Sequence, residues 1–306
     1  MRRRSKTLID SPTAGLVLVC YGAFGVATTV VAETMPVVAI VLLCLAVTLH
    51  SSLQHEVLHG HLSRNRLLAV AAVFPAMGLF IPYERFRDTH LAHHHDETLT
   101  DPYDDPESHF VDPAVWRSMP GWKQAVLRFN NTLAGRMLVG PAISLLGFWR
   151  KDLLAMRRGD RAVMRAYALH FAGVMMIITW LAALSPMPFL FYLIGCYIGL
   201  SLLKIRTYLE HRAHEESGKR SVIIEDRGPL ALLFLNNNLH ALHHDQPDLR
   251  WYDLPAAYAT RREDILRRND HYLYRNYGQI FRRYLFRAKD QVPHPLRHAG
   301  PARTGQ

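Results

Sequence analysis

Cysteine is scarce in this sequence, with only three among 306 residues. Cys20, Cys44 and Cys196 all lie inside apolar runs, where cysteine behaves as a small buried hydrophobe. They are too few and too scattered to build a disulfide scaffold or a thiolate metal site. The sequence also contains no internal repeat, no heptad array and no low-complexity tract, and the basic residues at its start are followed by no signal-peptide cleavage site.

Acidic residues are also in short supply, with 26 Asp and Glu against 36 Lys and Arg, which leaves a net charge of +10. The basic residues gather in stretches that alternate with long uncharged runs, and 49% of all residues are hydrophobic. This segregation indicates an integral membrane protein with several spans. Because the positive charge flanks the apolar runs and forms no nucleic-acid-binding motif, we expect no nucleic-acid partner.

Four uncharged runs approach the roughly 20 residues that a helix needs to cross about 30 Å of hydrocarbon. They are Gly15–Ala32, Val37–Leu53, Ala166–Leu184 and Met187–Leu203. The connectors 33–36 and 185–188 carry no Lys or Arg, whereas both flanks and the region 85–165 are rich in Arg. By the positive-inside rule, both termini and the central region are cytoplasmic. Since Arg far outnumbers Lys, as in GC-rich bacteria, we expect a bacterial inner membrane.

The remaining apolar runs are predicted to lie at the membrane surface or to re-enter it. These are Leu67–Pro82 and Leu133–Trp149, while Gly228–Leu239 is too short to span and returns the chain to the surface. The predicted fold is all-α: four transmembrane helices in two hairpins, interfacial helices and a cytoplasmic helical cap. Residues 1–290 form one integral-membrane domain, and residues 291–306 form a flexible tail.

Histidine is concentrated in short clusters of regular spacing. His55 and His59 stand four apart in HEVLH, and HLAHH and HALHH each place three histidines at i, i+3 and i+4. On a helix these positions share one face, so each HxxHH aims three imidazoles at one point. Imidazole is a good ligand for iron, zinc and copper. A fourth cluster contains His211 and His214. About nine nitrogen ligands are too many for one ion, so the pattern predicts two metals.

Several polar residues near the clusters are candidates for orienting the ligand rings, because a metal-bound imidazole donates its other N–H to a carboxylate or carbonyl. They are Glu56, Asp88, Asp96, Glu210, Asn236 and Asp245. An asparagine one turn before His240 is also placed to hold a metal-bound water, the alternative being a helix N-cap. Candidate walls of an apolar substrate site are Phe74, Met77, Phe80, Tyr83 and Phe86.

Two other classes of protein remain open at this point. HEVLH matches HExxH of zinc peptidases, in which Glu56 would be the general base, but that interpretation leaves both HxxHH triplets unexplained. A histidine-rich metal transporter or store should carry polar groups deep in several spans, and the four runs contain no charge.

The three boxes HEVLH, HLAHH and HALHH, in this order and following the second and fourth runs, resemble those of the membrane fatty acid desaturase superfamily. RTYLEHRA and WYDLPAAY are similar to features of its bacterial members, and the resemblance covers about Ala39 to Leu285. The first box has three intervening residues where several desaturases have four. No HPGG-type haem motif occurs, which puts an internal electron donor in doubt.

The resemblance implies a non-haem di-iron centre, O2 as co-substrate, and a lipid or acyl substrate. It also implies electrons from a separate ferredoxin, rubredoxin or cytochrome b5-type donor. Carried over position by position, the iron ligands are His55, His59, His90, His93, His94, His211, His240, His243 and His244. No catalytic residue is implied beyond these ligands. Hydroxylases and other monooxygenases of the superfamily share the boxes, so the resemblance leaves desaturation and hydroxylation both open.

Overall fold

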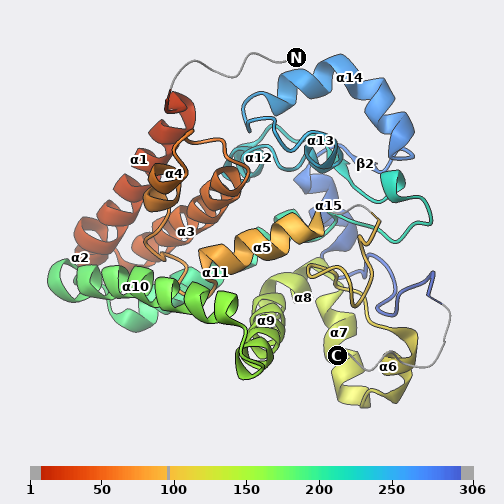
Figure 1. Cartoon of the computed structure of the whole chain (residues 1–306), viewed down its shortest axis with the longest axis horizontal. Helices are drawn as coiled ribbons and strands as arrows, with labels where there is room; N and C mark the ends of the chain where they lie inside the picture. Colours follow the sequence, from red (N-terminus) through yellow and green to blue (C-terminus); the bar gives the residue numbers. More distant parts are fainter. Residues whose placement is uncertain (1–7, 95–96, 298–306) are drawn as a thin grey trace. The chain divides into compact units, whose positions relative to one another are not determined.

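The structure is a computed structural model that describes residues 8–94 and 97–297 (Figure 1). The chain is mostly helical and forms two compact units. Unit 1 comprises Met1–Arg87 and Ala142–Leu203, and unit 2 comprises Asp88–Pro141 and Lys204–Gln306. The helices α5 (Tyr83–His93), α9 (Gly140–Arg157) and α11 (Phe189–Thr207) carry the chain from one unit into the other. The two units are described separately below.

Four helical segments are long and apolar enough to cross a membrane, which confirms the predicted all-α class and the number of spans. The first is Ser11–Thr34 and consists of α1 (Ser11–Val26), a π-helical turn (Ala27–Val31) and α2 (Ala32–Thr34). The others are α3 (Pro36–Leu58), α10 (Arg161–Leu184) and α11. Half of the apolar window of α3 is buried, more than in the other three, so α3 is the most enclosed span.

Local sequence signals explain where these helices begin. Asp10 caps α1, because its carboxylate accepts the backbone N–H of Thr13 at 3.2 Å and the Thr13 hydroxyl at 2.6 Å. Asp160 caps α10 in the same way by accepting the N–H groups of Ala162 and Val163. Pro36 begins α3, where its fixed φ suits the first helical turn and its missing N–H costs nothing.

Small residues let the spans approach closely. In Figure 1, α1 and α3 run side by side in unit 1. Between α3 and α11, a Cβ on Gly195 would lie 2.6 Å from Leu43, and one on Gly199 would lie 3.0 Å from Val47. The Thr48 hydroxyl donates to the Gly199 carbonyl at 3.1 Å. Close backbone approach with such a bond is the usual means by which helices associate in lipid.

The predicted run Leu67–Pro82 is a short helix, α4 (Arg66–Ala72), followed by an irregular segment at 73–82. The side chains of Val73 and Met77 are fully buried within unit 1. Irregular backbone is tolerated at membrane depth only where its polar groups are satisfied by protein. Donors from the surrounding helices supply this: Tyr192 Oη donates to Met77 O, His170 Nε2 to Leu79 O, and Trp149 Nε1 to Phe80 O, all within 2.9 Å.

Gly173 of α10 packs directly against the backbone of the irregular segment at 73–82. We expect its substitution to destabilise unit 1. Its carbonyl accepts Ala76 N–H at 3.2 Å, and an added Cβ would lie 2.6 Å from the Phe74 carbonyl oxygen. Overpacking of this kind costs about 1–3 kcal/mol, so Gly173→Ala should lower the thermal midpoint of the detergent-solubilised protein. Gly147→Ala is the control, because no atom lies within 4 Å of a Cβ there. Equal midpoints for the two variants would contradict this packing.

The other two apolar runs are each broken in the structure. Leu133–Trp149 becomes α8 (Leu133–Leu138) and the first half of α9, with the break at Val139. Gly228–Leu239 becomes α12 (Pro229–Leu233) and a turn in which Leu235 and Asn236 have φ values of 51° and 56°. This turn leads directly into α13 (His240–Asp245), so it positions the last histidine box.

Unit 2 is a set of short helices around a two-residue parallel strand pair. Its further elements are α6 (Pro113–Ser118), α7 (Gly121–Asn130), a 3-10 turn (Ser217–Lys219), β1 (Ile223–Ile224), α14 (Leu254–Arg268), β2 (Leu273–Tyr274) and α15 (Tyr277–Tyr284). Ile223 of β1 lies opposite Leu273 of β2. Ile223 also belongs to the core that holds α13 against α14, with Leu242, Leu254 and Ile265. Strands this short show no alternation in the sequence, and we predicted none.

Part of the predicted tail is bound to unit 2. Val111 N–H donates to Val292 O, and His294 N–H donates to Val111 O. Arg297 Nη1 lies 2.7 Å from an Asp101 carboxylate oxygen. The segment 291–297 therefore pairs with the chain at Val111, through a parallel bridge between Val111 and Pro293. Residues 298–306 of the predicted tail lie outside the described residues.

Candidate metal centre

The two HxxHH triplets lie on helices of the predicted kind. His90 and His93 are on α5, with His94 directly after it, and His240, His243 and His244 are all on α13. Because α13 follows the strained turn at Leu235 and Asn236 and packs on α14, its histidine-bearing face is fixed in unit 2. His211 follows the end of α11 at Thr207 and pairs with Ser221 in an isolated bridge.

Four histidines of unit 2 converge on one point. Each of His93, His211, His240 and His244 offers a ring nitrogen, and these nitrogens all lie within 4.8 Å of one another. His211 Nε2 is 2.9 Å from His93 Nε2 and 3.0 Å from His240 Nε2. The first three rings are buried, and His244 is partly exposed. These rings come from α5, from the segment after α11 and from α13, so three parts of the sequence build one cluster.

The remaining histidines of the triplets form a second group in unit 2. His94 Nε2 lies 3.0 Å from His90 Nε2 and 3.2 Å from His243 Nε2. The His94 ring also stacks on His244 with the centroids 4.4 Å apart. Each triplet is thus divided between two groups of rings: α13 gives His240 and His244 to the first group and His243 to the second.

The first box lies at the end of α3 in unit 1. The rings of His55 and His59 are neighbours there, with centroids 4.8 Å apart. Glu56 between them accepts a hydrogen bond from His61 Nδ1 at 2.8 Å. His61 is therefore the hydrogen-bond partner of Glu56.

The outward ring nitrogens of the unit 2 cluster are held by polar partners. His93 Nδ1 lies 2.8 Å from Asp105, and His90 Nδ1 lies 3.1 Å from Glu107. His240 Nδ1 is 3.2 Å from Asn237 Oδ1, and the Ser221 hydroxyl is 3.1 Å from His211 Nδ1. These are the contacts that fix a ligand's tautomer and ring plane in metal sites.

These contacts direct lone pairs into the cluster. The N–H on Nδ1 of His93 donates to the Asp105 carboxylate, and the N–H on Nδ1 of His240 donates to the Asn237 amide oxygen. In the neutral form of each ring, Nε2 therefore carries the lone pair. Lone pairs that face one another at about 3 Å repel unless a proton or a metal ion lies between them. The donor set therefore fits a metal ion bound through nitrogen, as iron or zinc is.

Burial and charge act in different directions on these rings. Burial lowers the pKa of His240 and of His211 well below the usual value, and the neighbouring imidazoles lower it further. Both rings are therefore neutral, which is the ligand form. Burial alone also lowers the pKa of His93, but Glu107 and Asp105 outweigh it and raise the pKa to about 9. His93 is the ring with the strongest negative surroundings.

The predicted ring-orienting residues lie elsewhere in several cases. Asn236 donates its amide to Trp251 O, and its neighbour Asn237 is the residue against His240. Asp245 pairs with Arg261 and Arg268. Glu210 lies 3.2 Å from Arg206 and 3.7 Å from His240 Nδ1, so it is near the cluster. Asp88 is exposed, and Asp96 lies outside the described residues.

Sequence reasoning missed Asp105, Glu107 and Ser221, and of the asparagines before His240 it selected Asn236, whereas Asn237 is the one that contacts the ring. The density of carboxylates in the loop 100–108, shortly after the second box, was a usable signal for Asp105 and Glu107. The loop is folded so that the Asp105 carboxylate also accepts the N–H groups of Thr100 and Glu107. Asp105 therefore holds both the loop and the His93 ring. No feature of the sequence around Ser221 indicated that it contacts a histidine of the cluster.

The predicted substrate residues lie in and after the irregular segment of unit 1. Met77 is fully buried and Tyr83 is nearly so, while Phe74 and Phe80 are half-buried. The Phe80 ring packs edge-on against Trp149, with centroids 6.3 Å apart. Phe86 is half-buried on α5. Their role in substrate binding stays a prediction.

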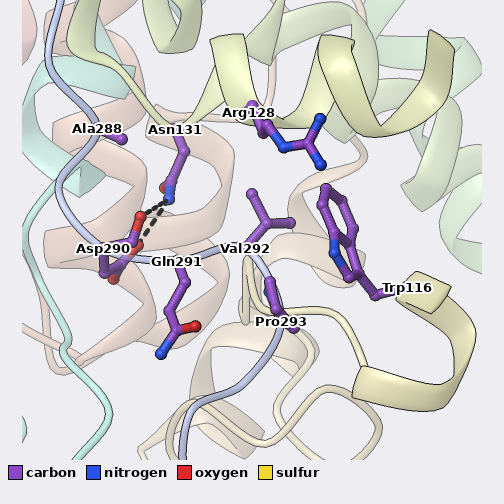
Figure 2. Close-up of a pocket in the computed structure, with 8 residues that line it drawn as sticks. All are labelled: Trp116, Arg128, Asn131, Ala288, Asp290, Gln291, Val292 and Pro293. Carbon is purple, nitrogen blue, oxygen red and sulfur yellow. Dashed lines mark hydrogen bonds between the residues drawn. The ribbon is translucent and has the colours of Figure 1, made fainter. Parts of the chain in front are cut away.

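A cavity of about 390 Å³ lies in unit 2 between α6, α7 and the segment 288–293 (Figure 2). It is lined by Trp116, Arg128, Asn131, Ala288, Asp290, Gln291, Val292 and Pro293. Its lining contains no histidine, so we assign it no part in metal chemistry. Figure 2 shows Asn131 donating to the carboxylate and the backbone carbonyl of Asp290, at 2.8 and 2.7 Å.

Asp290 is expected to make the stability of the protein depend on acid pH. Burial opposes its charge, but Lys289, His109 and Asn131 outweigh burial and hold the pKa at about 2, below the ordinary 3.8. The stabilisation, about 2 kcal/mol, is complete above pH 4 and disappears as the pH falls through the folded-state value. Acid titration of the thermal midpoint should show this loss, and Asp290→Asn should flatten the curve between pH 4 and 2. If the thermal midpoint of Asp290→Asn fell below pH 4 as steeply as that of the wild type, Asp290 would not be the source of the acid sensitivity.

One comparison with known proteins identifies the family of this chain. The model of the fatty acid desaturase family matches residues 32–276, a range that contains all three histidine boxes and His211. No curated protein matches the chain significantly. The match covers most of the chain, the boxes lie on helices, and the histidines of unit 2 converge as ligands do. This chain therefore belongs to the fatty acid desaturase family.

Proposed function

We propose that this protein is an O2-dependent di-iron oxidoreductase of the membrane that introduces a double bond into a fatty acyl chain. The overall reaction is –CH2–CH2– + O2 + 2 e⁻ + 2 H⁺ → –CH=CH– + 2 H2O. The two electrons come from a separate carrier of the ferredoxin, rubredoxin or cytochrome b5 type. The observation that carries the proposal is the convergence of His93, His211, His240 and His244, together with family membership.

The proposed ligands of the two irons are nine histidines. One iron takes His93, His211, His240 and His244. The other takes His90, His94 and His243 of unit 2, together with His55 and His59, whose assignment rests on the HEVLH box alone. When bound, the irons supply the oxidant that an unactivated C–H bond requires.

The protein's own residues orient and shield the site. Asp105 and Asn237 accept hydrogen bonds from Nδ1 of His93 and His240 and so direct Nε2 of both rings inward. Glu107 does the same for His90. His93, whose pKa is raised, would release the proton on Nε2 when a metal binds. Burial of these rings limits the access of bulk water, which protects a reactive centre from side reactions. No side chain is required as a general acid or base in the C–H step itself.

The proposed setting is a bacterial inner membrane with both termini in the cytoplasm. This orientation rests on the positive-inside rule, because the short connectors 33–36 and 185–188 carry no Lys or Arg. The four apolar spans give a lipid substrate direct access from the bilayer. The basic residues on the cytoplasmic segments favour an acidic electron carrier.

The zinc-peptidase alternative is disfavoured by the surroundings of the first box. In that chemistry Glu56 must activate a metal-bound water, but its carboxylate is hydrogen-bonded to His61 at 2.8 Å. A peptidase would also leave the unit 2 cluster without a role. A metal transporter is disfavoured because each of the four spans has an 18-residue window with at most two charged residues.

The test is expression with a ferredoxin and its reductase, followed by lipid profiling and metal analysis of the purified protein. About two irons per chain and acyl chains with a new double bond are expected. Hydroxylated acyl chains with the same iron content would instead support the monooxygenase alternative. One zinc per chain and unchanged lipids would overturn the proposal.

A further inference from the structure

The four converging histidines of unit 2 are not equally enclosed. His93, His211 and His240 are buried, whereas His244 is partly exposed. His244 forms one wall of a cavity of about 110 Å³. The cavity is lined by Ser217, Gly218, Ser221, Ala241, His244, Asp245, Ile265, Arg268 and Asn269.

This cavity lies between the protein surface and residues of the histidine cluster. Its rim is exposed at Gly218, Asp245 and Arg268, and Arg268 pairs with Asp245 at 3.0 Å. Its floor is buried at Ser221 and Asn269. The Ser221 hydroxyl lies 3.1 Å from His211 Nδ1. The cavity therefore contacts one of the four histidines directly and a second one through Ser221.

The size and polarity of the cavity select what it can admit. Ligand pockets for drug-sized molecules measure roughly 300–1,000 Å³, so this cavity is too small for an acyl chain or an organic cofactor. Hydroxyl, amide, carboxylate and guanidinium groups line it, and a polar site of this volume can hold several water molecules.

We propose that this cavity is the route by which water-sized polar molecules pass between solvent and the metal centre. The inference rests on the proposed function, whose reaction takes up two protons and releases two water molecules in each turnover. Water in the buried site has to exchange with solvent, and the partly exposed His244 is where the cluster meets this cavity. Ser217 and Gly218 of the 3-10 turn form its outer edge.

Gly218 offers a way to close the cavity without disturbing its walls. A Cβ there would meet only the Arg268 carbonyl oxygen, at the ordinary contact distance of 3.9 Å. The larger side chain of Gly218→Leu should therefore extend into the open space of the cavity. Gly218→Ala is the conservative variant that leaves it open. Gly121→Leu, at an exposed glycine of α7 with no atom within 4 Å of its Cβ, controls for added surface leucine.

The probe is azide, a small charged ligand that does not cross lipid readily. Iron content is measured first, and stopped-flow absorbance then follows azide binding to the iron-loaded, air-oxidised protein. Gly218→Leu should slow azide association by about tenfold or more at unchanged iron content, because closing the route raises the barrier. Gly218→Ala and Gly121→Leu should bind azide at the wild-type rate. Ser217→Leu, on the same edge, should repeat the effect.

The outcomes separate this inference from the proposed function. Iron loading with equal azide rates in wild type, Gly218→Leu and Ser217→Leu would overturn the route alone. A wild-type protein that takes up no iron would overturn the proposed function, and the inference with it.

Discussion

His93→Ala is expected to remove iron from the first group of histidines and to reduce product formation by more than about 100-fold. Loss of a residue that only orients a ligand costs 10–100-fold in metal affinity or activity, and loss of the ligand itself should exceed that range. His93 is buried, its Nε2 lies 2.9 Å from His211 Nε2, and its Nδ1 is held by Asp105.

The measurement is iron per chain together with desaturated lipid in cells that supply the electron carrier. His271→Asn is the matched control, because His271 is exposed and Asn tolerates its positive φ of 49°. It should retain the iron and the activity of the wild type. Full iron content and activity in His93→Ala would remove the basis for the metal centre.

Asp105→Ala is expected to weaken metal binding by about 10–100-fold although Asp105 is not itself a predicted ligand. Its carboxylate lies 2.8 Å from His93 Nδ1 and is 5% exposed as a residue, so no solvent replaces it. Without it, the His93 ring is free to rotate and its tautomer is no longer fixed. The same carboxylate accepts the N–H groups of Thr100 and Glu107, so the loop 100–108 should loosen as well.

A metal titration of the purified protein separates these two effects. Asp104→Ala is the control, because Asp104 is exposed in the same loop and its loss should leave the affinity unchanged. Asp105→Asn keeps an acceptor for the loop but no charge for His93, and we expect an intermediate affinity. A lower thermal midpoint with unaltered metal affinity in Asp105→Ala would mean that Asp105 supports only the loop.

The spans and the boxes could be predicted because each is a local property of the sequence. Pro36–Leu58 and Arg161–Leu184 are continuous apolar helices, and their length and composition do not depend on distant residues. The i, i+3, i+4 spacing of His240, His243 and His244 likewise follows from helix geometry alone. The irregular segment at 73–82 was predicted only as a membrane-associated run, because its stability depends on donors such as Tyr192 that are distant in sequence.

The residues that orient the rings could not be predicted in the same way. Asp105 reaches His93 from a loop 12 residues later, and Ser221 reaches His211 across an isolated bridge. Asn236 and Asn237 are adjacent and chemically identical, but in the turn before α13 Asn236 donates to Trp251 O and Asn237 contacts His240.

The sequence by itself determined that the chain has four apolar helices and that its histidines lie on shared helix faces, since both follow from the repeat of a single helix. Only the tertiary structure decided how the triplets are divided, with His93, His240 and His244 in one group and His90, His94 and His243 in the other. Rings at i and i+3 on one helix face the same side but point to places several ångströms apart. Which place each ring reaches is set by the packing of α13 on α14 and by the path of the chain through His211.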